Sequence, residues 1–148
     1  MMEDNMEYVV FKLNGEFYGV DINNVENIER YTEITRVPYT NKYIKGIINL
    51  RGNITPVIDL RERFGLPASD LTDEMRIMIV KAKELNIGMV VDSSSEVLQL
   101  DIEDIDEAPT VSAGTDENFI SKIGKKDGRI VMLIDILKVL NLVEMEVE

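Results

Sequence analysis

Apolar residues recur at every second position along much of the chain, which is the period of strands with one buried face. The clearest example is the segment 46–66, GIINLRGNITPVIDLRERFGL. It predicts two strands joined at Arg51-Gly52-Asn53, because Gly and Asn tolerate the positive φ of a tight turn. The alternation assigns an apolar face to Ile48, Leu50, Ile54, Pro56, Ile58 and Leu60. The opposite face then carries Ile47, Asn49, Arg51, Asn53, Thr55, Val57 and Asp59.

A short helix is predicted directly after this hairpin. Asp59 is a good N-cap residue, and Glu62 follows three residues later, as in a capping box. Gly65 and then Pro67 are typical of a helix end.

The remaining strands of the first half follow from similar signals. Residues 7–13 and 17–22 are strand-like, and Asn14-Gly15 between them is a strong hairpin signal. Residues 23–30 begin as one helical turn and continue as a strand through Ile28. Residues 31–39 are expected to be extended, since Val37 precedes a proline. Residues 68–75 form a polar link.

The pattern starts again after this link. Residues 7–20 align without gaps on the segment that starts at Arg76, an offset of 69 that pairs Gly19 with Gly88. Further along, the offset is 76, and Asp59 aligns with Asp135. Seven inserted residues, placed within residues 101–117, account for the change. We infer two copies of one small β-unit.

This repeat predicts a mainly β fold with short helices. Closure of each copy into a small β-barrel would remove exposed strand edges. We expect a single domain over residues 1–148, with barrel repeats at 7–67 and 76–142 whose termini may be exchanged between barrels. Residues 76–80 and 130–136 are apolar on both faces, so the barrels should share an apolar seam.

Composition excludes several classes of function. The 148 residues contain no Cys and no His, so thiolate zinc sites, disulfides and the usual general base are absent. We expect no metal site and no cofactor. No apolar run is long enough to span a membrane, and the acidic N-terminus lacks a signal-peptide pattern, which favours the cytoplasm. The net charge of −12 argues against nucleic acid and anionic membranes as partners.

The residues resemble the CheW-like domain family of bacterial chemotaxis. The resemblance rests on Asn49-Leu50-Arg51-Gly52 followed by Pro56-Val57-Ile58-Asp59-Leu60, on the preceding residues 43–46 (YIKG), and on residues 16–22 (EFYGVDI). It covers roughly residues 8–142. It implies two SH3-like five-stranded barrels. It also implies a non-catalytic adaptor that joins the histidine kinase CheA, through its CheW-like regulatory domain, to the cytoplasmic tips of methyl-accepting chemotaxis receptors. Recruitment to membrane receptor arrays is implied as well.

The same resemblance implies two sets of contact residues. The receptor-binding set is Val25, Asn27, Ile28, Asn49, Arg51 and Gly52. The kinase-binding set is Arg36, Val37, Tyr43, Ile44 and Gly46. The family often has Glu in a V-x-E-I motif, where it can pair with the Arg of NLRG, but this chain has Asn27 there. Glu26 or Glu29 could replace it as the partner of Arg51.

Each of these residues also has a purely structural interpretation. Arg51 could be a solvated turn residue, Gly46 and Gly52 could provide only backbone freedom, and Val25 and Ile28 could belong to the core. Asn49 could be a hydrogen-bonding residue at a strand end.

Two further functions stay open beside the adaptor. Asp59 and Asp135 could form the carboxylate pair of a hydrolase, although both fit an N-cap better. A single-stranded nucleic-acid site would need aromatic residues beside basic ones, and the only local group of that kind is Tyr31, Tyr39 and Tyr43 near Arg36, Lys42 and Lys45. The acidic run 101–107 lacks the spacing of a calcium loop and is interpreted as a solvated loop.

Overall fold

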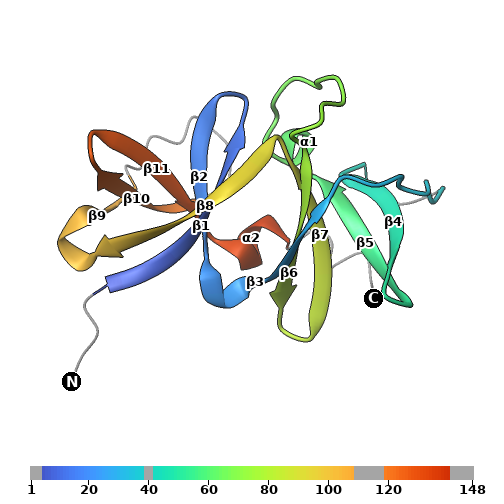
Figure 1. Ribbon diagram of the computed structural model, residues 1–148, viewed down its shortest axis with the longest axis horizontal. Helices are drawn as coiled ribbons and strands as arrows, with labels where there is room; N and C mark the ends of the chain where they lie inside the picture. The colour runs from blue at the N-terminus through green and yellow to red at the C-terminus, as the bar shows by residue number, and fades with distance from the viewer. Residues whose placement is uncertain (1–4, 39–41, 109–118, 141–148) are drawn as a thin grey trace.

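The computed structural model describes residues 5–38, 42–108 and 119–140, and these form a mainly β molecule of two small β-subdomains (Figure 1). The first copy of the repeat contains β1 (Asn5–Leu13), β2 (Glu16–Asp21), η1 (Ile22–Asn24), β3 (Val25–Arg30), β4 (Ile44–Leu50), β5 (Asn53–Asp59) and α1 (Leu60–Arg63). The second contains β6 (Arg76–Ala82), β7 (Leu85–Val91), β8 (Ser93–Asp101), η2 (Ile102–Asp104), β9 (Ile105–Glu107), β10 (Ile120–Lys126), β11 (Arg129–Ile134) and α2 (Ile136–Val139). In the described part of the chain no helix is long and apolar enough to cross a membrane.

The two sheets do not follow the two copies. One sheet has the order β8-β1-β2-β11-β10-β9, and the other has the order β3-β6-β7-β5-β4. The first two strands of each copy therefore pair with later strands of the other copy. We predicted one barrel from residues 7–67 and one from residues 76–142, with only the termini exchanged. In the structure, groups of whole strands are exchanged between the two copies. The end of the second range, at residue 142, lies outside the described residues.

Four pairings join strands of different copies: the antiparallel pairs β1–β8 and β3–β6 and two parallel pairs. β11 pairs with β2, with Met132 opposite Tyr18, and β5 pairs with β7, with Ile58 opposite Met89. The neighbouring pairs are antiparallel hairpins, such as β1–β2 and β6–β7. The first sheet has six strands instead of the expected five, because the three-residue strand β9 adds to its β10 edge.

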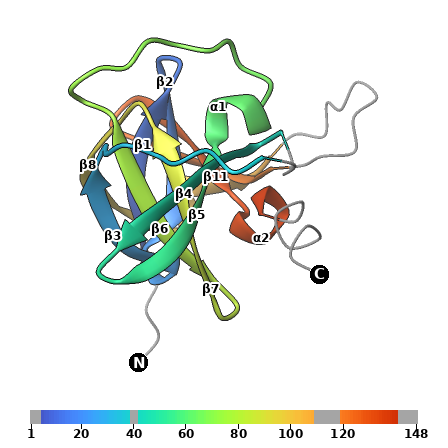
Figure 2. The ribbon, with the colours of Figure 1, turned by 90° about the vertical axis from the view of Figure 1, so that its right-hand side faces the viewer.

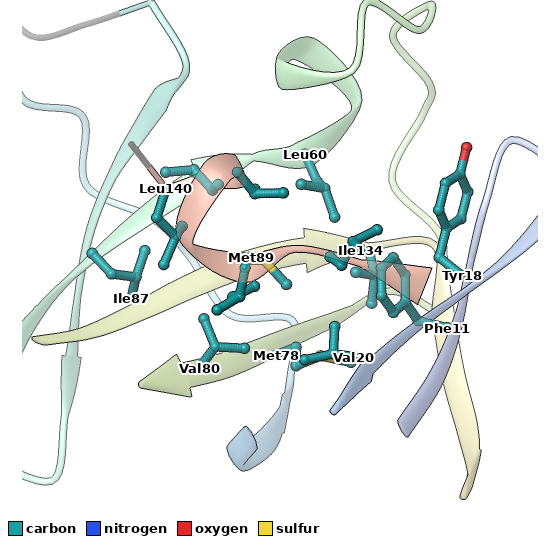
Figure 3. Close-up of a cluster of buried hydrophobic side chains, with 14 of the residues drawn as sticks. Phe11, Tyr18, Val20, Leu60, Met78, Val80, Ile87, Met89, Ile134 and Leu140 are labelled. Carbon is teal, nitrogen blue, oxygen red and sulfur yellow. The ribbon is translucent and has the colours of Figure 1, made fainter. Parts of the chain in front are cut away.

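Three apolar clusters form the core. One lies inside each sheet: Tyr8, Val10, Leu98, Leu100, Val131 and Leu133 in the first, and Ile48, Val57, Ile77, Ile79 and Val90 in the second. The third and largest lies between the sheets and confirms the predicted seam (Figure 3). It combines side chains such as Phe11 and Val20 from one sheet with Met78 and Met89 from the other. Strands β1 and β6 are buried on both faces because alternate residues enter two clusters.

The predicted faces of the central hairpin were partly wrong. Ile54 is 65% exposed, whereas Thr55 is buried opposite Ile48 and Val57 is fully buried. Ile58, on the other face, enters the seam. The period of two was right, but both faces carry apolar residues, so hydrophobicity alone could not identify the inner one.

The turns and caps agree with the sequence signals. Positive φ occurs at Asn14 and Gly15, and again at Arg51 and Gly52. The second turn therefore ends one residue earlier than expected, and Asn53 belongs to β5. The Asp59 side chain accepts a hydrogen bond from the Glu62 N–H, and the Asp135 side chain accepts from two N–H groups of α2. Both aspartates are therefore N-caps, and the two short helices lie near each other at one side of the molecule (Figure 2).

Candidate functional site

The candidate site begins at β3, which is an edge strand of its sheet. A β-bulge between Val25 and Asn27 shifts the alternation of this strand. Val25 lies opposite Val80 and Ile28 lies opposite Met78, so both point toward the seam between the subdomains. Val25 packs against the shared core, whereas Ile28 is 38% exposed. The core interpretation therefore fits Val25, and the surface interpretation fits Ile28.

An ion pair connects β3 to the tip of the β4–β5 hairpin. The Arg51 Nη2 atom lies 3.5 Å from Oε2 of Glu29, and the Asn27 amide donates to the same oxygen at 2.5 Å. The Arg51 side chain is 71% exposed, and that of Glu29 is 28% exposed. Glu26 instead lies 4.0 Å from Lys81. Of the two alternatives, Glu29 is thus the partner of Arg51, and Asn27 orients its carboxylate.

Asn49 and Gly52 define the shape of the hairpin tip. The Asn49 Oδ1 atom accepts a hydrogen bond from the Gly52 N–H at 2.9 Å, as the strand-end interpretation anticipated. Gly52 has φ +87°, and a Cβ added there would meet no atom within 4 Å. The structure thus brings the tip residues beside Asn27, through Arg51 and Glu29. Val25 and Ile28 lie on the other face of the same strand.

Part of the predicted kinase-binding set surrounds a surface hollow of about 410 Å³. Arg36 and Ile44 line it, together with Tyr31, Ile34, Lys42, Lys45 and Asp59. The Lys45 ammonium is 3.8 Å from the Asp59 carboxylate. Most of the aromatic and basic residues considered as a nucleic-acid site therefore do lie together, and the Asp59 carboxylate lies among them. Tyr39 lies outside the described residues. Val37 is half-buried, and Tyr43 directly precedes β4.

Gly46 is buried under the chain that crosses β4. Thr35 exchanges two backbone hydrogen bonds of 2.9 Å with Ile47, and a Cβ on Gly46 would lie 2.1 Å from the Thr35 carbonyl oxygen. This close approach explains the glycine in structural terms. Gly46 can contribute to a kinase-binding face only by holding the segment that carries Arg36 in place.

Comparison with known proteins identifies the family. The family model described as CheW-like domain matches residues 7–144. The chain belongs to the CheW-like domain family. It is 40% identical over 134 residues to the chemotaxis protein CheW of Bacillus subtilis (strain 168), covering 90% of this chain and 85% of that one. The chemotaxis protein CheW of Klebsiella aerogenes is 35% identical over 139 residues, covering 94% and 84%.

A solved structure shares the fold. The scaffolding protein TtCheW from Thermoanaerobacter tengcongensis superposes with a TM-score of 0.80 at 38% identity, covering 88% of each chain. The CheW-like resemblance and the mainly β fold of two subdomains, both predicted from the sequence, are confirmed.

Two ion pairs of this CheW-like chain were missed by the sequence analysis. Arg61 donates to both carboxylate oxygens of Asp92, at 3.0 and 2.7 Å. Arg129 likewise donates to both oxygens of Glu96, at 3.0 and 2.7 Å. The hydrogen bonds from Arg129 lower the pKa of Glu96. Each partner lies about thirty positions from the other, so strand periodicity gives no signal for either pair.

The repeat, however, could have suggested the glutamate of the second pair, although not its arginine, because the offset of 76 aligns Arg129 with Asn53 rather than with Arg51. With the offset of 69, Asn27 corresponds to Glu96, and each follows a β-bulge in the edge strand of its sheet. The second copy thus has a glutamate at the position where the first copy has Asn27. Its partner comes from β11, the equivalent of β5.

The aspartates considered for catalysis have structural partners in this CheW-like chain. Asp59 and Asp135 cap α1 and α2, and Asp59 also faces Lys45. Asp104 in the acidic run accepts from the Asp101 N–H, which stabilises the single turn η2. Within the described residues, no group of three or more Asp, Glu, His or Cys side chains is arranged to hold a metal.

Proposed function

We propose that the chain is a non-catalytic chemotaxis adaptor that couples the histidine kinase CheA to methyl-accepting chemotaxis receptors. It acts in the cytoplasm and is recruited to membrane receptor arrays. Membership of the CheW-like family supports this role, as do relatives named chemotaxis protein CheW. No nucleic acid, cofactor or metal takes part in the proposed function.

The observation that carries the proposal is the Glu29–Arg51 contact, supported by Asn27. It holds an exposed guanidinium at the tip of the β4–β5 hairpin, next to an edge strand whose other face presents Ile28. An apolar strip beside a few oriented polar groups suits an amphipathic helix. The proposed receptor-binding surface therefore consists of Asn27, Ile28, Asn49, Arg51 and Gly52, with Val25 supporting it through its packing against the shared core.

The proposed kinase-binding surface lies on the segment that crosses and enters β4. Its members are Arg36, Val37, Tyr43, Ile44 and Gly46, of which Gly46 acts through the backbone. An adaptor needs both partners bound at once, so the two surfaces must be separable by mutation. Arg36 and Arg51 are both exposed arginines, and each belongs to one surface alone.

The experiment compares Arg51→Ala with Arg36→Ala. Both purified variants are tested for kinase binding by pull-down and for receptor-dependent kinase activation. We expect Arg51→Ala to keep kinase binding and to lose activation at least about fivefold, since a hot-spot truncation costs above about 1 kcal/mol. Arg36→Ala should weaken the pull-down instead.

Thermal unfolding provides the control for both variants, because neither side chain is buried. If Arg51→Ala unfolds like the wild type and supports normal activation, the receptor surface is misplaced. Turnover of a hydrolase substrate that disappears with Asp59→Asn would contradict the non-catalytic role itself.

A further inference from the structure

Two aromatic residues occupy the same position in the two copies of the repeat. Tyr43 directly precedes β4, Phe119 directly precedes β10, and the offset between them is the same 76 that relates Asp59 to Asp135. The backbone repeats this match. The Asp59 N–H donates to the Tyr43 carbonyl at 2.8 Å, and the Asp135 N–H donates to the Phe119 carbonyl at 2.7 Å. The two rings therefore lie at equivalent places in the two subdomains.

Arg63, the last residue of α1, contacts both of these rings. Its guanidinium lies 5.1 Å from the centre of the Tyr43 ring and 4.5 Å from the centre of the Phe119 ring. Both distances are within the range of a cation–π interaction. The residue is only 6% exposed, and such an interaction is stronger where water is excluded. One buried charge thus holds the rings of both copies.

The hydrogen bonds of Arg63 also run to the other copy. Its Nε and Nη2 atoms donate to the carbonyls of Val139 and Lys138, in the last turn of α2, at 2.8 and 3.0 Å. With the offset of 76, Val139 is the counterpart of Arg63 itself. A residue that binds its own counterpart, and both members of an equivalent pair, lies near the axis that relates the two copies. The two short helices accordingly lie close together (Figure 2).

A position near such an axis has room for one arginine only. A second guanidinium at residue 139 would place two like charges together in a buried region, which is strongly unfavourable. The second copy instead has Val139, which is fully buried. The contact is therefore made once, by the first copy, and it serves both.

We propose that Arg63 is a positioning residue that holds the Tyr43 ring in place on the proposed kinase-binding surface. Arg63 is too buried to present its own side chain to a partner, whereas Tyr43 is half-buried at the entry to β4. The inference rests on the proposed function, because Tyr43 belongs to the kinase-binding set given there. Arg63 acts on the kinase through Tyr43, and α2 of the second copy is its anchor.

The test compares Arg63→Met with Arg61→Met in the full chain. Met is similar in length and packs well against aromatic rings, but it has neither the charge nor the donors. Arg61 lies on the same helix and pairs with Asp92 instead. Both variants should unfold at a lower denaturant concentration than the wild type, since each loses hydrogen bonds of an arginine. We expect only Arg63→Met to weaken the affinity for the kinase, by at least about fivefold.

A double-mutant cycle with Tyr43→Ala shows whether Arg63 acts through this ring. We expect Tyr43→Ala to weaken kinase binding and Arg63→Met to add no further loss in the double variant. Losses that multiply, or kinase binding by Arg63→Met that equals that of Arg61→Met, would overturn the proposal. A Tyr43→Ala variant that binds the kinase normally would show that the kinase-binding surface itself is misplaced, and the role of Arg63 would be overturned with it.

A measurement without the kinase tests the positioning alone. The chain has five tyrosines, so fluorotyrosine labelling gives five fluorine NMR signals, and Tyr43→Phe identifies the one from Tyr43. We expect Arg63→Met to shift the Tyr43 signal and Arg61→Met to leave it in place. A Tyr43 signal that stays unchanged in Arg63→Met would overturn the positioning role, whatever the kinase titrations give.

Discussion

At the scale of single residues, the Glu29–Arg51 contact fixes the geometry of the proposed receptor-binding surface. Two glutamates flank Asn27 on β3, and Glu29 but not Glu26 contacts Arg51. We predict that Glu29→Gln reduces receptor-dependent kinase activation, because Arg51 loses the charge that holds it. Glu26→Gln is the matched control, and it should leave activation unchanged. The comparison is measured with reconstituted receptor and kinase; equal effects of both substitutions would show that net charge, not this contact, matters.

Gly46 and Gly52 are both in the central hairpin and differ in what surrounds them. A Cβ at Gly46 would collide with the Thr35 carbonyl, whereas space around Gly52 is open and only its φ of +87° is unfavourable. We predict that Gly46→Ala destabilises the protein by roughly 2–4 kcal/mol and Gly52→Ala by about 1 kcal/mol. Urea unfolding measures both. A Gly52→Ala variant less stable than Gly46→Ala would contradict the assigned close approach.

The stability of the folded protein should depend on pH through Asp92, which forms an ion pair with Arg61. Burial alone would raise the pKa of Asp92, but hydrogen bonds from Arg61 and from the Asn14 N–H, with the guanidinium charge, together hold that pKa below its usual range. Because the folded-state pKa is below the unfolded one, the stabilisation is complete above the unfolded pKa and is lost as pH falls through the folded pKa. The Asp92 side chain is 24% exposed, so the pair is only partly screened by solvent.

We therefore predict that Asp92→Asn lowers the free energy of unfolding by about 1.5–3 kcal/mol at pH 7. The difference from the wild type should shrink progressively as the pH falls below about 4, where the unfolded-state carboxylate of the wild type is protonated first and the folded-state carboxylate at still lower pH. Urea titrations over a pH series measure it. A difference that is constant down to pH 2 would assign the effect to packing instead.

At the scale of elements, the two short helices depend on their caps. Asp59 accepts one N–H of α1, whereas Asp135 accepts two N–H groups of α2. We predict that Asp59→Ala and Asp135→Ala each cost roughly 0.5–2 kcal/mol of stability, with the larger loss at Asp135. Chemical denaturation gives both values. Unchanged midpoints would argue against capping as the role of these aspartates.

Much of this element structure could be predicted because its signals are local. The turns and the helix end were predicted from Asn14-Gly15, Gly52 and Gly65. The helix caps were predicted from the aligned Asp59 and Asp135. The predictions that failed needed information from distant strands. Which face of the hairpin is buried, and hence why Ile54 is exposed and Thr55 buried, depends on where β6 and β7 pack. The pattern of apolar residues in the hairpin does not give the positions of those strands.

The candidate site shows the same division. Arg51 and Asn49 were identified from a resemblance of the local motif, but the choice between Glu26 and Glu29 needed the bulge in β3. Arg63 gave no sequence signal at all, because its partners are the carbonyls of a helix 75 and 76 residues away.

At the scale of the whole molecule, the shared seam and the exchanged strands make the two subdomains one cooperative unit. Neither sheet can form while the other half of the chain is unfolded, since each needs strands from both copies. We predict a single unfolding transition, with equal calorimetric and van't Hoff enthalpies. Differential scanning calorimetry measures this, and two resolved transitions would contradict it.

The same strand exchange has a consequence for how such a chain could arise. Swapping the copies turns the order β8-β1-β2-β11-β10 into β3-β6-β7-β5-β4, so every pairing in the five-stranded sheet has its equivalent in the six-stranded sheet, which adds only β9. Two separate polypeptides, each with one copy, could make all these pairings by twofold symmetry. The present molecule is therefore topologically equivalent to a strand-swapped homodimer of one-copy chains, with the two subunits joined end to end. In such a dimer, Asn27 and Glu96 would occupy one symmetry-related position, and joining the copies in a single chain lets that position carry two different side chains.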